Sequence, residues 1–541
     1  MKRIKGSALP AVLFFLVTCQ AKTPVIYFIY PHIGEMGEPV TITGANFGKI
    51  RDETSYVTIA GAQPTSMSYL DWRDSEISFR TPEFGEAGLV YVHVKGKKSN
   101  GVLFANQATL PLHVYDSEIG QGPRIVSVVP NTAMTGSLVS ISGTGFGSSR
   151  GNSGVFFSWN AEIPASMPAE ARVPEFTEVM ESEYGYELWS EREIRVRVPD
   201  GVTGGNMEVR TARGVSPPFY FDPGNKPGTK TYRDKRSYTI NYTVNVKTAE
   251  AEIPNTLYLW VPRPAASAAQ RNIELLSSSV EPFVESYRGT SLFKLDDLAA
   301  NSEAQISLSW KIEVYSVESS VRYQSIRQDA DSQPSGVYTQ STAQLPSDDP
   351  RIRNQAALIL GRERNSYLKA QRIYEWMLKE FIYQPDQSDG SIFNALETKQ
   401  ADPYLAALLC CTLMRSAGIP SQPVAGVLIS RDRQTMDHYW AEFWIDGFGW
   451  LPADPVMGAE AVPAQFGSHP DKANFYFGNT DSQRIAFSRG FAVLSPMDPR
   501  GRTVTRSRSY ALQNLWEEVV GGIESYSSLW GGITITGMYA Q

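Results

Sequence analysis

A histidine and an aspartate within residues 401–455 have the types and spacing to do chemistry together. His438 lies on a strand that alternating residues predict over 437–445, and Asp454 follows a segment rich in Gly and Trp. A carboxylate can hold an imidazole ring in place while the ring takes a proton from a thiol or hydroxyl nucleophile. The same pair can also persist without catalysis, because each polar group satisfies the other when both are buried. The absence of a nucleophile would favour this second interpretation.

The residues around this pair follow an ordered set of short motifs. An apolar run closes with Arg-Ser-Ala-Gly-Ile-Pro at 415–420, His-Tyr-Trp-Ala-Glu follows at 438–442, and Gly-Phe-Gly-Trp at 447–450 precedes Asp-Pro at 454–455. This order resembles the core of the transglutaminase-like family, a branch of the papain-like cysteine enzymes. The resemblance implies an α+β core in which the histidine is the base, the aspartate holds its ring, and a cysteine at the start of a helix is the nucleophile.

The resemblance also implies where that cysteine should be. The position, about twelve residues before Arg415, holds Pro403 with Asp402 beside it, and neither side chain can attack as a thiolate. The local residues still predict the helix, since Asp402 is a good N-cap and Pro403 suits the first helical position. A cysteine there would have its thiolate stabilised by the helix N-terminus. The sequence therefore predicts the helix start without its nucleophile.

Two other cysteines, Cys410 and Cys411, lie two turns further along the same predicted helix, roughly 10 Å from its start at about 1.5 Å per residue. The surrounding residues 405–414 are apolar on every side, which is typical of a buried helix. Free cysteine in such a place behaves as a small hydrophobe, and a disulfide between these neighbours would be strained. We expect two core residues. The alternative is that one of them is an unusual nucleophile.

Several further side chains are candidates for lining a cleft beside the histidine. Trp440 and Glu442 follow it on the same predicted strand, and Trp450 precedes the aspartate. Arg484 and Arg489 lie in a later segment similar to one that these proteins carry beyond the aspartate. The arginines can bind an acidic side chain or a C-terminal carboxylate. The favoured interpretation is that they are structural ion-pair partners.

Composition limits the classes of protein to consider. The 541 residues suggest three to five domains. A net charge of −7 and a pI near 5.5 argue against nucleic acid as the main partner. With three cysteines the chain is not a disulfide scaffold, and the sequence predicts no metal and no cofactor. A peptide or protein ligand is the expected partner.

Residues 1–19 predict export. A basic N-terminal end precedes an apolar stretch, 8–17, that is too short to span a membrane, as in a signal peptide. The end, Leu-Val-Thr-Cys, resembles a lipoprotein processing site, although the stricter pattern has a smaller residue than Thr before the Cys. Lipidation of Cys19 would anchor the protein in the cell envelope, in the periplasm or at the cell surface. The alternative is cleavage after Ala21, which would give a secreted soluble protein.

Two internal repeats lie between residues 24 and 223. A proline, a glycine and a phenylalanine recur with an offset of 99 residues, and a strand that ends in a Gly-rich turn before a plugging Phe explains the pattern. Both repeats, 24–117 and 122–223, resemble the IPT/TIG family of immunoglobulin-like β-sandwiches, which implies binding or spacer modules. A Glu-rich insertion, about 162–186, is either a decorated loop, which is favoured, or a partner-binding feature. The recurring residues are Pro31, Gly44 and Phe47, then Pro130, Gly143 and Phe146.

Residues 229–323 predict a third β-sandwich. Alternating strands recur there, and Leu-Trp-Val-Pro-Arg-Pro at 259–264 is similar to the β domain that precedes bacterial transglutaminase-like cores. A polar linker leads to the core, 345–541, in which the clearest helix is predicted over 367–381. The predicted fold is multidomain, with three all-β sandwich domains, two of them immunoglobulin-like, followed by an α+β transglutaminase-like (papain-like) core.

Two functions are consistent with these residues. The first is a non-catalytic protein that binds a peptide or protein, because the nucleophile is missing. The second is an active amidase, protease or acyltransferase that uses the His438–Asp454 pair with an unusual nucleophile. The side chain that faces the histidine distinguishes them. A cysteine within roughly 3–4 Å of the His438 ring would favour the active enzyme. Pro403 or Asp402 facing the ring would exclude thiol catalysis.

Overall fold

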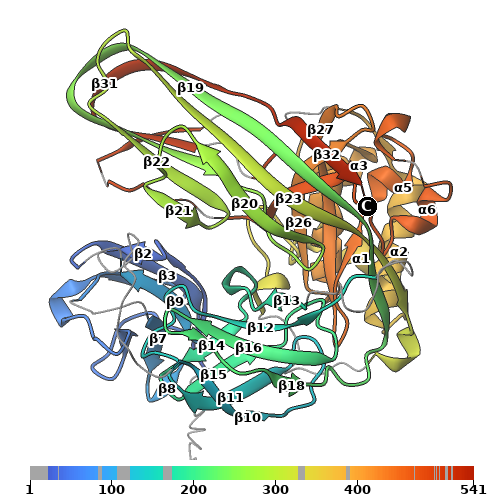
Figure 1. The fold of residues 1–541 in the computed structure, drawn as a ribbon, viewed down its shortest axis with the longest axis horizontal. Helices are drawn as coiled ribbons and strands as arrows, with labels where there is room; N and C mark the ends of the chain where they lie inside the picture. Colours follow the sequence, from blue (N-terminus) through green and yellow to red (C-terminus); the bar gives the residue numbers. More distant parts are fainter. Residues whose placement is uncertain are drawn as a thin grey trace, which may run out of the picture.

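The computed structural model describes residues 22–540 except 35, 83–87, 107–121, 163–173, 327–335, 386–389, 468, 493, 495, 499, 506–509 and 513–515. The predicted export segment with Cys19 and residues 163–173 of the Glu-rich insertion lie outside the described residues. Strands make up 49% of the structure and helices 15%, which confirms a β-rich multidomain architecture. Two small sandwiches, a long curved sheet and a mixed core are visible in Figure 1.

Each repeat folds as a two-sheet β-sandwich. The first has β1 (Val25–Tyr30), β2 (Ile33–Gly34), β3 (Pro39–Ala45), β4 (Tyr56–Ile59), β5 (Tyr69–Trp72), β6 (Glu76–Arg80), β7 (Gly88–Val94), β8 (Lys97–Lys98) and β9 (Val102–Asn106). The second has β10 (Arg124–Val129), β11 (Leu138–Thr144), β12 (Gly154–Trp159), β13 (Glu175–Glu178), β14 (Tyr186–Trp189), β15 (Glu193–Arg197), β16 (Gly205–Thr211), β17 (Gly214–Val215) and β18 (Phe219–Phe221). The order β1-β3-β6-β5 of one sheet recurs as β10-β11-β15-β14, so the repeat in sequence is a repeat in topology.

The same contacts close the end of both sandwiches. Trp72 Nε1 donates a hydrogen bond to Phe47 O at 2.9 Å, and Trp189 Nε1 donates to Phe146 O at 3.1 Å. Both phenylalanines are buried in the sandwich cores. A Cβ atom on Gly143 would lie 2.1 Å from a backbone oxygen of β10, so only glycine fits there. The predicted plugging role of the phenylalanines is confirmed.

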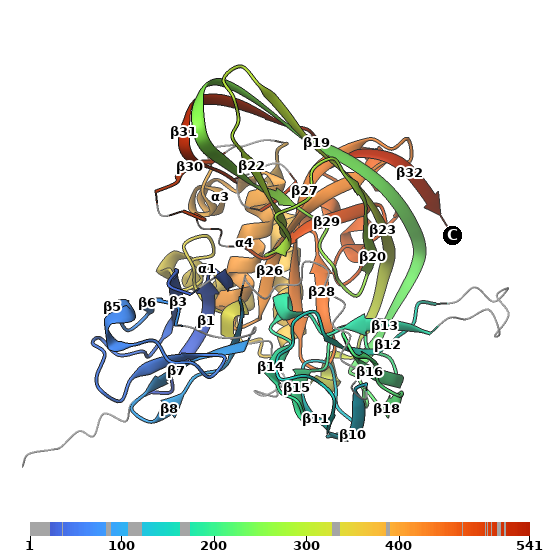
Figure 2. The ribbon, with the colours of Figure 1, turned by 60° about the vertical axis from the view of Figure 1, so that its left-hand side comes forward.

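A continuous eight-stranded sheet follows the sandwiches. Its strands are β19 (Gly228–Pro262), β20 (Gln270–Ser278), β21 (Val284–Tyr287), β22 (Thr290–Asp296), β23 (Glu303–Val321), β30 (Arg502–Thr505), β31 (Trp516–Trp530) and β32 (Thr534–Ala540). The order is β20-β23-β19-β22-β21, and β19 pairs in addition with β31 and β32. In both ribbon views the red C-terminal strands run beside the long green β19 (Figures 1 and 2).

This pairing corrects one predicted boundary. The sequence assigned everything from 345 to 541 to the core, whereas residues 516–540 complete the sheet of residues 228–321. The physical reason is that β19 offers backbone partners on both edges along its length, and the C-terminal strands occupy the edge that β22 and β23 leave open. The core is thus inserted between two parts of one sheet.

The core itself is a four-stranded sheet covered by helices. Its strands are β26 (Ser421–Ile429), β27 (Thr435–Ile445), β28 (Gly449–Ala453) and β29 (Arg484–Arg489), in the order β28-β27-β26-β29, and a short pair is formed by β24 (Ile382–Tyr383) and β25 (Gln400–Ala401). Its helices are α1 (Pro350–Leu360), α2 (Ser366–Glu380), α3 (Ile392–Thr398), α4 (Pro403–Ser416), α5 (Pro455–Gly458) and α6 (Lys472–Phe475). Helix α2 confirms the helix predicted over 367–381.

Strand β26 passes between two hydrophobic cores. Leu428 packs with the helices of the core, whereas Val427 and Ile429 pack with the eight-stranded sheet. Helix α4 is buried along nearly its whole length beside β26 and β27. The elements that carry the histidine and the predicted helix start are therefore enclosed by helices on one side and by other domains on the other.

Candidate functional site

His438, Asp454 and Arg484 meet in a buried cluster. The histidine lies on β27, the aspartate directly follows β28, and the arginine begins β29. His438 Nε2 donates to Asp454 Oδ2 at 2.8 Å, and Arg484 Nη1 donates to the same oxygen at 3.0 Å. The structure thus brings together the two residues predicted as base and orienter, and it adds an arginine as a second partner of the carboxylate.

Asp454 is held as an anion. Its other oxygen, Oδ1, accepts from the Met457 N–H at 3.0 Å and so caps α5. Burial alone would raise the pKa of Asp454, but His438, Arg484 and this N–H outweigh burial and hold the pKa below its ordinary range. Asp481 lies 3.4 Å from the arginine on its other side. Because Arg484 supplies a positive partner on the same oxygen, Asp454 stays ionised inside the core.

The other ring nitrogen of His438, Nδ1, is buried and makes no hydrogen bond to any described group, sulfur included. The side chain has 0% exposed surface. His438 pairs with Gly426 and Gly426 with Ala486 across the sheet, and the Ala486 backbone is closed off by two hydrogen bonds of 2.8 Å with Gln270. A base must reach the proton that it removes. This ring reaches neither solvent nor a thiol.

Helix α4 starts as the sequence predicts. Asp402 is buried and its side chain accepts from the Leu405 N–H at 2.7 Å, and Pro403 is the first helical residue. This is the bond by which an N-cap satisfies a free N–H of the first turn. The position where the resemblance implies a cysteine is therefore occupied by a structural cap and a proline ring.

Cys410 and Cys411 are core residues. Both have 0% exposed surface and lie in the hydrophobic cluster of α1, α2 and α4. Burial raises the pKa of the Cys410 thiol well above its ordinary value and that of Cys411 to about 12. Neither sulfur is hydrogen-bonded to His438 Nδ1. The thiols are thus neutral at physiological pH and make no hydrogen bond to the histidine.

The four residues predicted to line a cleft are packed against other side chains in the structure. Trp440 packs under the Arg484 guanidinium, whose carbon lies 5.0 Å from the ring centroid. Trp450 packs edge-on against a neighbouring tryptophan at 5.4 Å. Glu442 and Arg489 form an ion pair of 2.9 Å. Both arginines are ion-pair partners, as the favoured interpretation had it.

The second sandwich supplies some of these contacts, and Figure 2 shows it beneath β26 and β28. Glu183 forms an ion pair with Arg489, and Tyr184 packs edge-on against Tyr338 at 5.8 Å. Both residues belong to the Glu-rich insertion, 162–186. The described end of that insertion is a segment docked on the core rather than a free loop.

Comparison with known proteins matches two parts of the chain. Residues 353–455, which include α4 and β26 to β28, match the transglutaminase-like superfamily. The chain carries a transglutaminase-like core. Residues 24–109 match the IPT/TIG domain, which confirms the resemblance for the first repeat.

Individual relatives are distant. An uncharacterized protein of Haemophilus influenzae is 28% identical over 163 residues, which cover 24% of this chain and 44% of that protein, so the chain spans less than half the length of this curated relative. The crystal structure of a candidate cysteine protease from Cytophaga hutchinsonii is 15% identical, with 58% of this chain and 92% of that chain covered and a TM-score of 0.35. The periplasmic domain of TgpA from Pseudomonas aeruginosa is 14% identical, with 42% and 91% covered and a TM-score of 0.25. These similarities carry no argument about activity.

Sequence reasoning missed two ion-pair partners, one inside the transglutaminase-like core and one that the second sandwich contributes. Arg484 was named only as a cleft or ion-pair residue, not as the partner of Asp454, and Glu183 was not named. A signal existed for the arginine, because a cation in an otherwise apolar strand needs a carboxylate. For Glu183, the Glu-rich composition of the insertion did not indicate which residue it would pair with. Among the described residues, no helix is both long and apolar enough to cross a bilayer, and no group of three or more His, Cys, Asp or Glu is placed to hold a metal ion.

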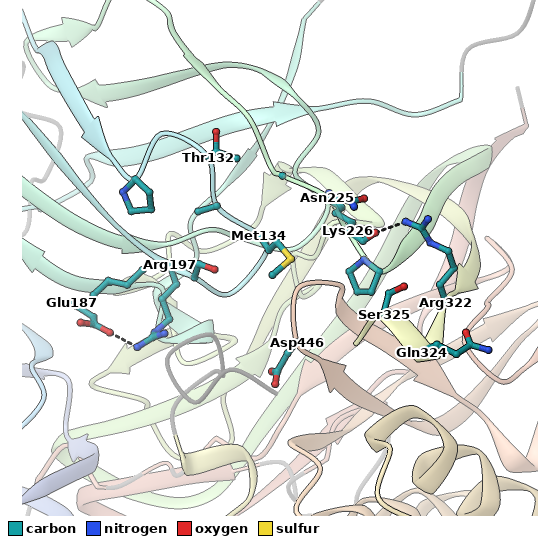
Figure 3. Close-up of a pocket in the computed structure, with 16 residues that line it drawn as sticks. Thr132, Met134, Glu187, Arg197, Asn225, Lys226, Arg322, Gln324, Ser325 and Asp446 are labelled. Carbon is teal, nitrogen blue, oxygen red and sulfur yellow. Dashed lines mark hydrogen bonds and ion pairs between the residues drawn. The ribbon is translucent and has the colours of Figure 1, made fainter. Parts of the chain in front are cut away.

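A cavity lies apart from the histidine of the transglutaminase-like core. It is found where the second sandwich, residues 224–227 and the core meet (Figure 3). Its volume is about 1160 Å³ and its lining carries both signs of charge, with the ion pair Glu187–Arg197 on one side and Arg322 and Asp446 on the other. No residue of the histidine cluster lines it. The cavity therefore does not extend the histidine site.

Proposed function

We propose that this protein is an exported, lipid-anchored binding protein whose transglutaminase-like core is non-catalytic and holds a peptide or protein segment. The observation that carries the proposal is the burial of His438. Its ring has 0% exposed surface, Nε2 is engaged by Asp454, and Nδ1 has no hydrogen-bond partner among the described groups. A base that reaches neither substrate nor nucleophile cannot begin acyl transfer.

The start of α4 supports the same function. Asp402 serves as the helix cap through its 2.7 Å hydrogen bond to the Leu405 N–H, and Pro403 has no reactive atom. Cys410 and Cys411 have thiols whose pKa burial raises, so the thiolate that attacks a carbonyl is scarce. The retained His–Asp pair then serves stability, because it satisfies two buried polar groups with each other.

The alternative is an active amidase, protease or acyltransferase with an unusual nucleophile. The observation in its favour is the 2.8 Å bond between His438 Nε2 and Asp454, since a carboxylate that fixes the ring from one side leaves the other nitrogen for a nucleophile. This alternative requires a thiol or hydroxyl group to come within hydrogen-bond reach of His438 Nδ1 after the covering segments move.

The location in the proposal is supported by residues 1–19. A basic end, a short apolar stretch and Cys19 at the processing position are the features of an exported lipoprotein. We expect Cys19→Ser to release the chain from the membrane fraction of the cells that make it. Retention of this variant in the membrane fraction would contradict the anchor.

Thiol reactivity tests the non-catalytic core. The folded chain and a Cys410→Ser/Cys411→Ser variant are treated with iodoacetamide between pH 6 and 9, and labelling is followed by mass spectrometry. At pH 8 a thiol with a pKa of about 12 is roughly 10⁻⁴ ionised, whereas an ordinary thiol near 8.5 is about one quarter ionised, a difference of roughly 2,000-fold. We expect Cys410 and Cys411, told apart from Cys19 by the masses of their peptides, to be labelled only in denaturant. Fast labelling of the folded chain that is lost in the double variant, with a rate that titrates well below about pH 8.5, would show an activated thiol. The active amidase, protease or acyltransferase would then be the better function.

A further inference from the structure

Residues 180–184 form the part of the second sandwich that enters the core. They make a tight turn between β13 and β14, closed by hydrogen bonds to Met180 O from Glu183 N at 3.3 Å and from Gly185 N at 3.0 Å. Tyr184 has a left-handed φ of 56°, a conformation that L residues with bulky side chains adopt rarely. The turn presents Glu183 and Tyr184 together to the core.

The ionic anchor of this contact is Arg489, whose side chain is 9% exposed. Its Nε and Nη2 donate to Glu442 Oε2 of β27 at 3.0 and 2.9 Å, and its Nη1 is left for Glu183 of the turn. A guanidinium has donors in a planar fork and can hold two carboxylates at once. The core by itself therefore presents an arginine with one donor edge in use and one available to an incoming carboxylate.

An aromatic cluster lies beside the arginine. Tyr184 of the turn packs edge-on against Tyr338 at 5.8 Å, Tyr338 against Trp450 at 4.9 Å, and Trp450 against Trp444 at 5.4 Å. Such edge-on pairs are favourable beyond the area that they bury. The Tyr338 hydroxyl also donates to the backbone oxygen of Ser182 at 3.3 Å. The turn is thus held by one charge, one ring and one backbone oxygen.

The turn does not fill its place completely. Trp444 Nε1 is buried and makes no hydrogen bond to any described group, although a buried indole N–H normally finds an acceptor. A cavity of about 20 Å³ remains there, lined in part by Glu183, Trp444 and Trp450, which is room for about one water molecule. Burial also raises the pKa of Glu183 despite the nearby Arg489. The turn satisfies the ionic and aromatic features of the core but leaves one donor unused.

We propose that the face of the core formed by Glu442, Trp444, Trp450 and Arg489 is a binding groove for an acidic peptide segment that ends in an aromatic residue, and that residues 181–184 are its built-in occupant. The inference rests on the proposed function, because it gives the binding module a site and a class of ligand. The turn reads Glu-Ser-Glu-Tyr. A partner segment with the same order places a carboxylate on the arginine, a ring on the aromatic cluster and a backbone oxygen on the Tyr338 hydroxyl.

Because residues 181–184 belong to the same chain as the groove, an external segment must compete with them for it. An occupant on the same chain binds intramolecularly, so its effective concentration is independent of the protein concentration and a free segment of equal intrinsic affinity is largely excluded. Weakening the turn without changing the groove should therefore tighten binding of an external segment. A change in the groove itself should abolish that binding.

The test measures binding of the fluorescent peptide acetyl-Glu-Ser-Glu-Tyr-amide to the full chain and to two variants that release the turn. Glu183→Gln keeps the shape of the turn and removes its charge, and Tyr184→Ser keeps the charge and removes the ring. Glu187→Gln is the matched control, because Glu187 is paired with Arg197 inside the second sandwich. Hydrogen exchange of residues 440–450 reports how far the groove opens in each form.

We expect each release variant to bind the peptide at least about tenfold more tightly than the wild type and Glu187→Gln, a difference of about 1.4 kcal/mol. Adding Arg489→Gln should remove this binding, and a peptide with Gln in place of both Glu should not bind to any form. Equal peptide affinity of the wild type and both release variants overturns the inference, whatever the exchange shows. Hydrolysis or acyl transfer of the peptide would instead overturn the non-catalytic function and leave the groove in place, so the two failures are distinguishable.

Discussion

Replacing Arg484 by Met should loosen the centre of the core while both small sandwiches keep their stability. The guanidinium is 4% exposed and lies 3.0 Å from Asp454 and 3.4 Å from Asp481. Methionine fills part of the space but carries no charge, so two carboxylates would remain inside the core without their cation. Removing one partner of a buried ion pair costs about 3–5 kcal/mol, because the charge left behind stays out of water.

Native-state hydrogen exchange of the β27 amides is the suitable assay, because a chain of several domains does not unfold in two states. A cost of about 3–5 kcal/mol corresponds to roughly 100- to 4,000-fold faster exchange, at about 1.4 kcal/mol per factor of ten. Arg431→Met is the control, since this arginine is exposed in the turn before β27. We expect its exchange to change by less than about threefold, as for most surface substitutions.

A second substitution tests the cause of the effect. Asp454→Asn removes the charge that Arg484→Met leaves buried, so the double variant should exchange more slowly than the sum of the two single effects requires. Acidification should act in the same direction, because the pKa of Asp454 rises once the arginine is gone and the protonated acid carries no charge. Exchange of Arg484→Met within about fivefold of the wild type, or strict additivity in the double variant, would refute the reasoning.

Three smaller predictions concern local chemistry. Gly143→Ala should lower the unfolding temperature of the second sandwich, because the added Cβ would lie 2.1 Å from a backbone oxygen, whereas Gly336→Ala, with nothing within 4 Å, should leave it unchanged in the same thermal scan. Asp402→Ala should cost about 1 kcal/mol by removing the α4 cap, seen as roughly fivefold faster native-state hydrogen exchange of the α4 amides, and Asp402→Ser should restore most of it. The stability that Asp454 contributes should be complete above about pH 4 and lost as the pH falls through its lowered pKa, so Asp454→Asn should flatten the acid limb of the unfolding curve.

Local features of this protein were predictable because a few neighbouring residues determine them. Asp402 and Pro403 define the start of α4 through cap chemistry alone. Alternation predicted the strand that became β27, and the 99-residue repeat predicted two sandwiches closed by the same Trp-to-Phe hydrogen bond. The pair His438–Asp454 was predictable from motif order, since the spacing of the motifs fixes the strands that carry them.

Contacts between distant segments were not predictable in the same way. Glu183 and Arg489 are 306 residues apart, and the residues around each one do not indicate that the two form an ion pair. The pattern of a strand shows which face is buried but not which strand it pairs with, so β31 was not recognised as a partner of β19. The family resemblance implied an open cleft beside the histidine. Whether that cleft is covered depends on how the second sandwich packs on the core, which the sequence does not show.

The C-terminal strands also determine when the large sheet can be finished during synthesis. β19 and β23 leave the ribosome early, but β31 and β32 follow only when residue 540 has been made, about 220 residues after β23 ends, which at 5–20 residues per second is a delay on the order of 10–40 s. During that interval one edge of β19 has unpaired N–H and C=O groups, which are a template for pairing with another chain. We therefore expect nascent chains of this protein to engage a chaperone before the last strands arrive, and chains truncated before residue 516 to aggregate rather than fold.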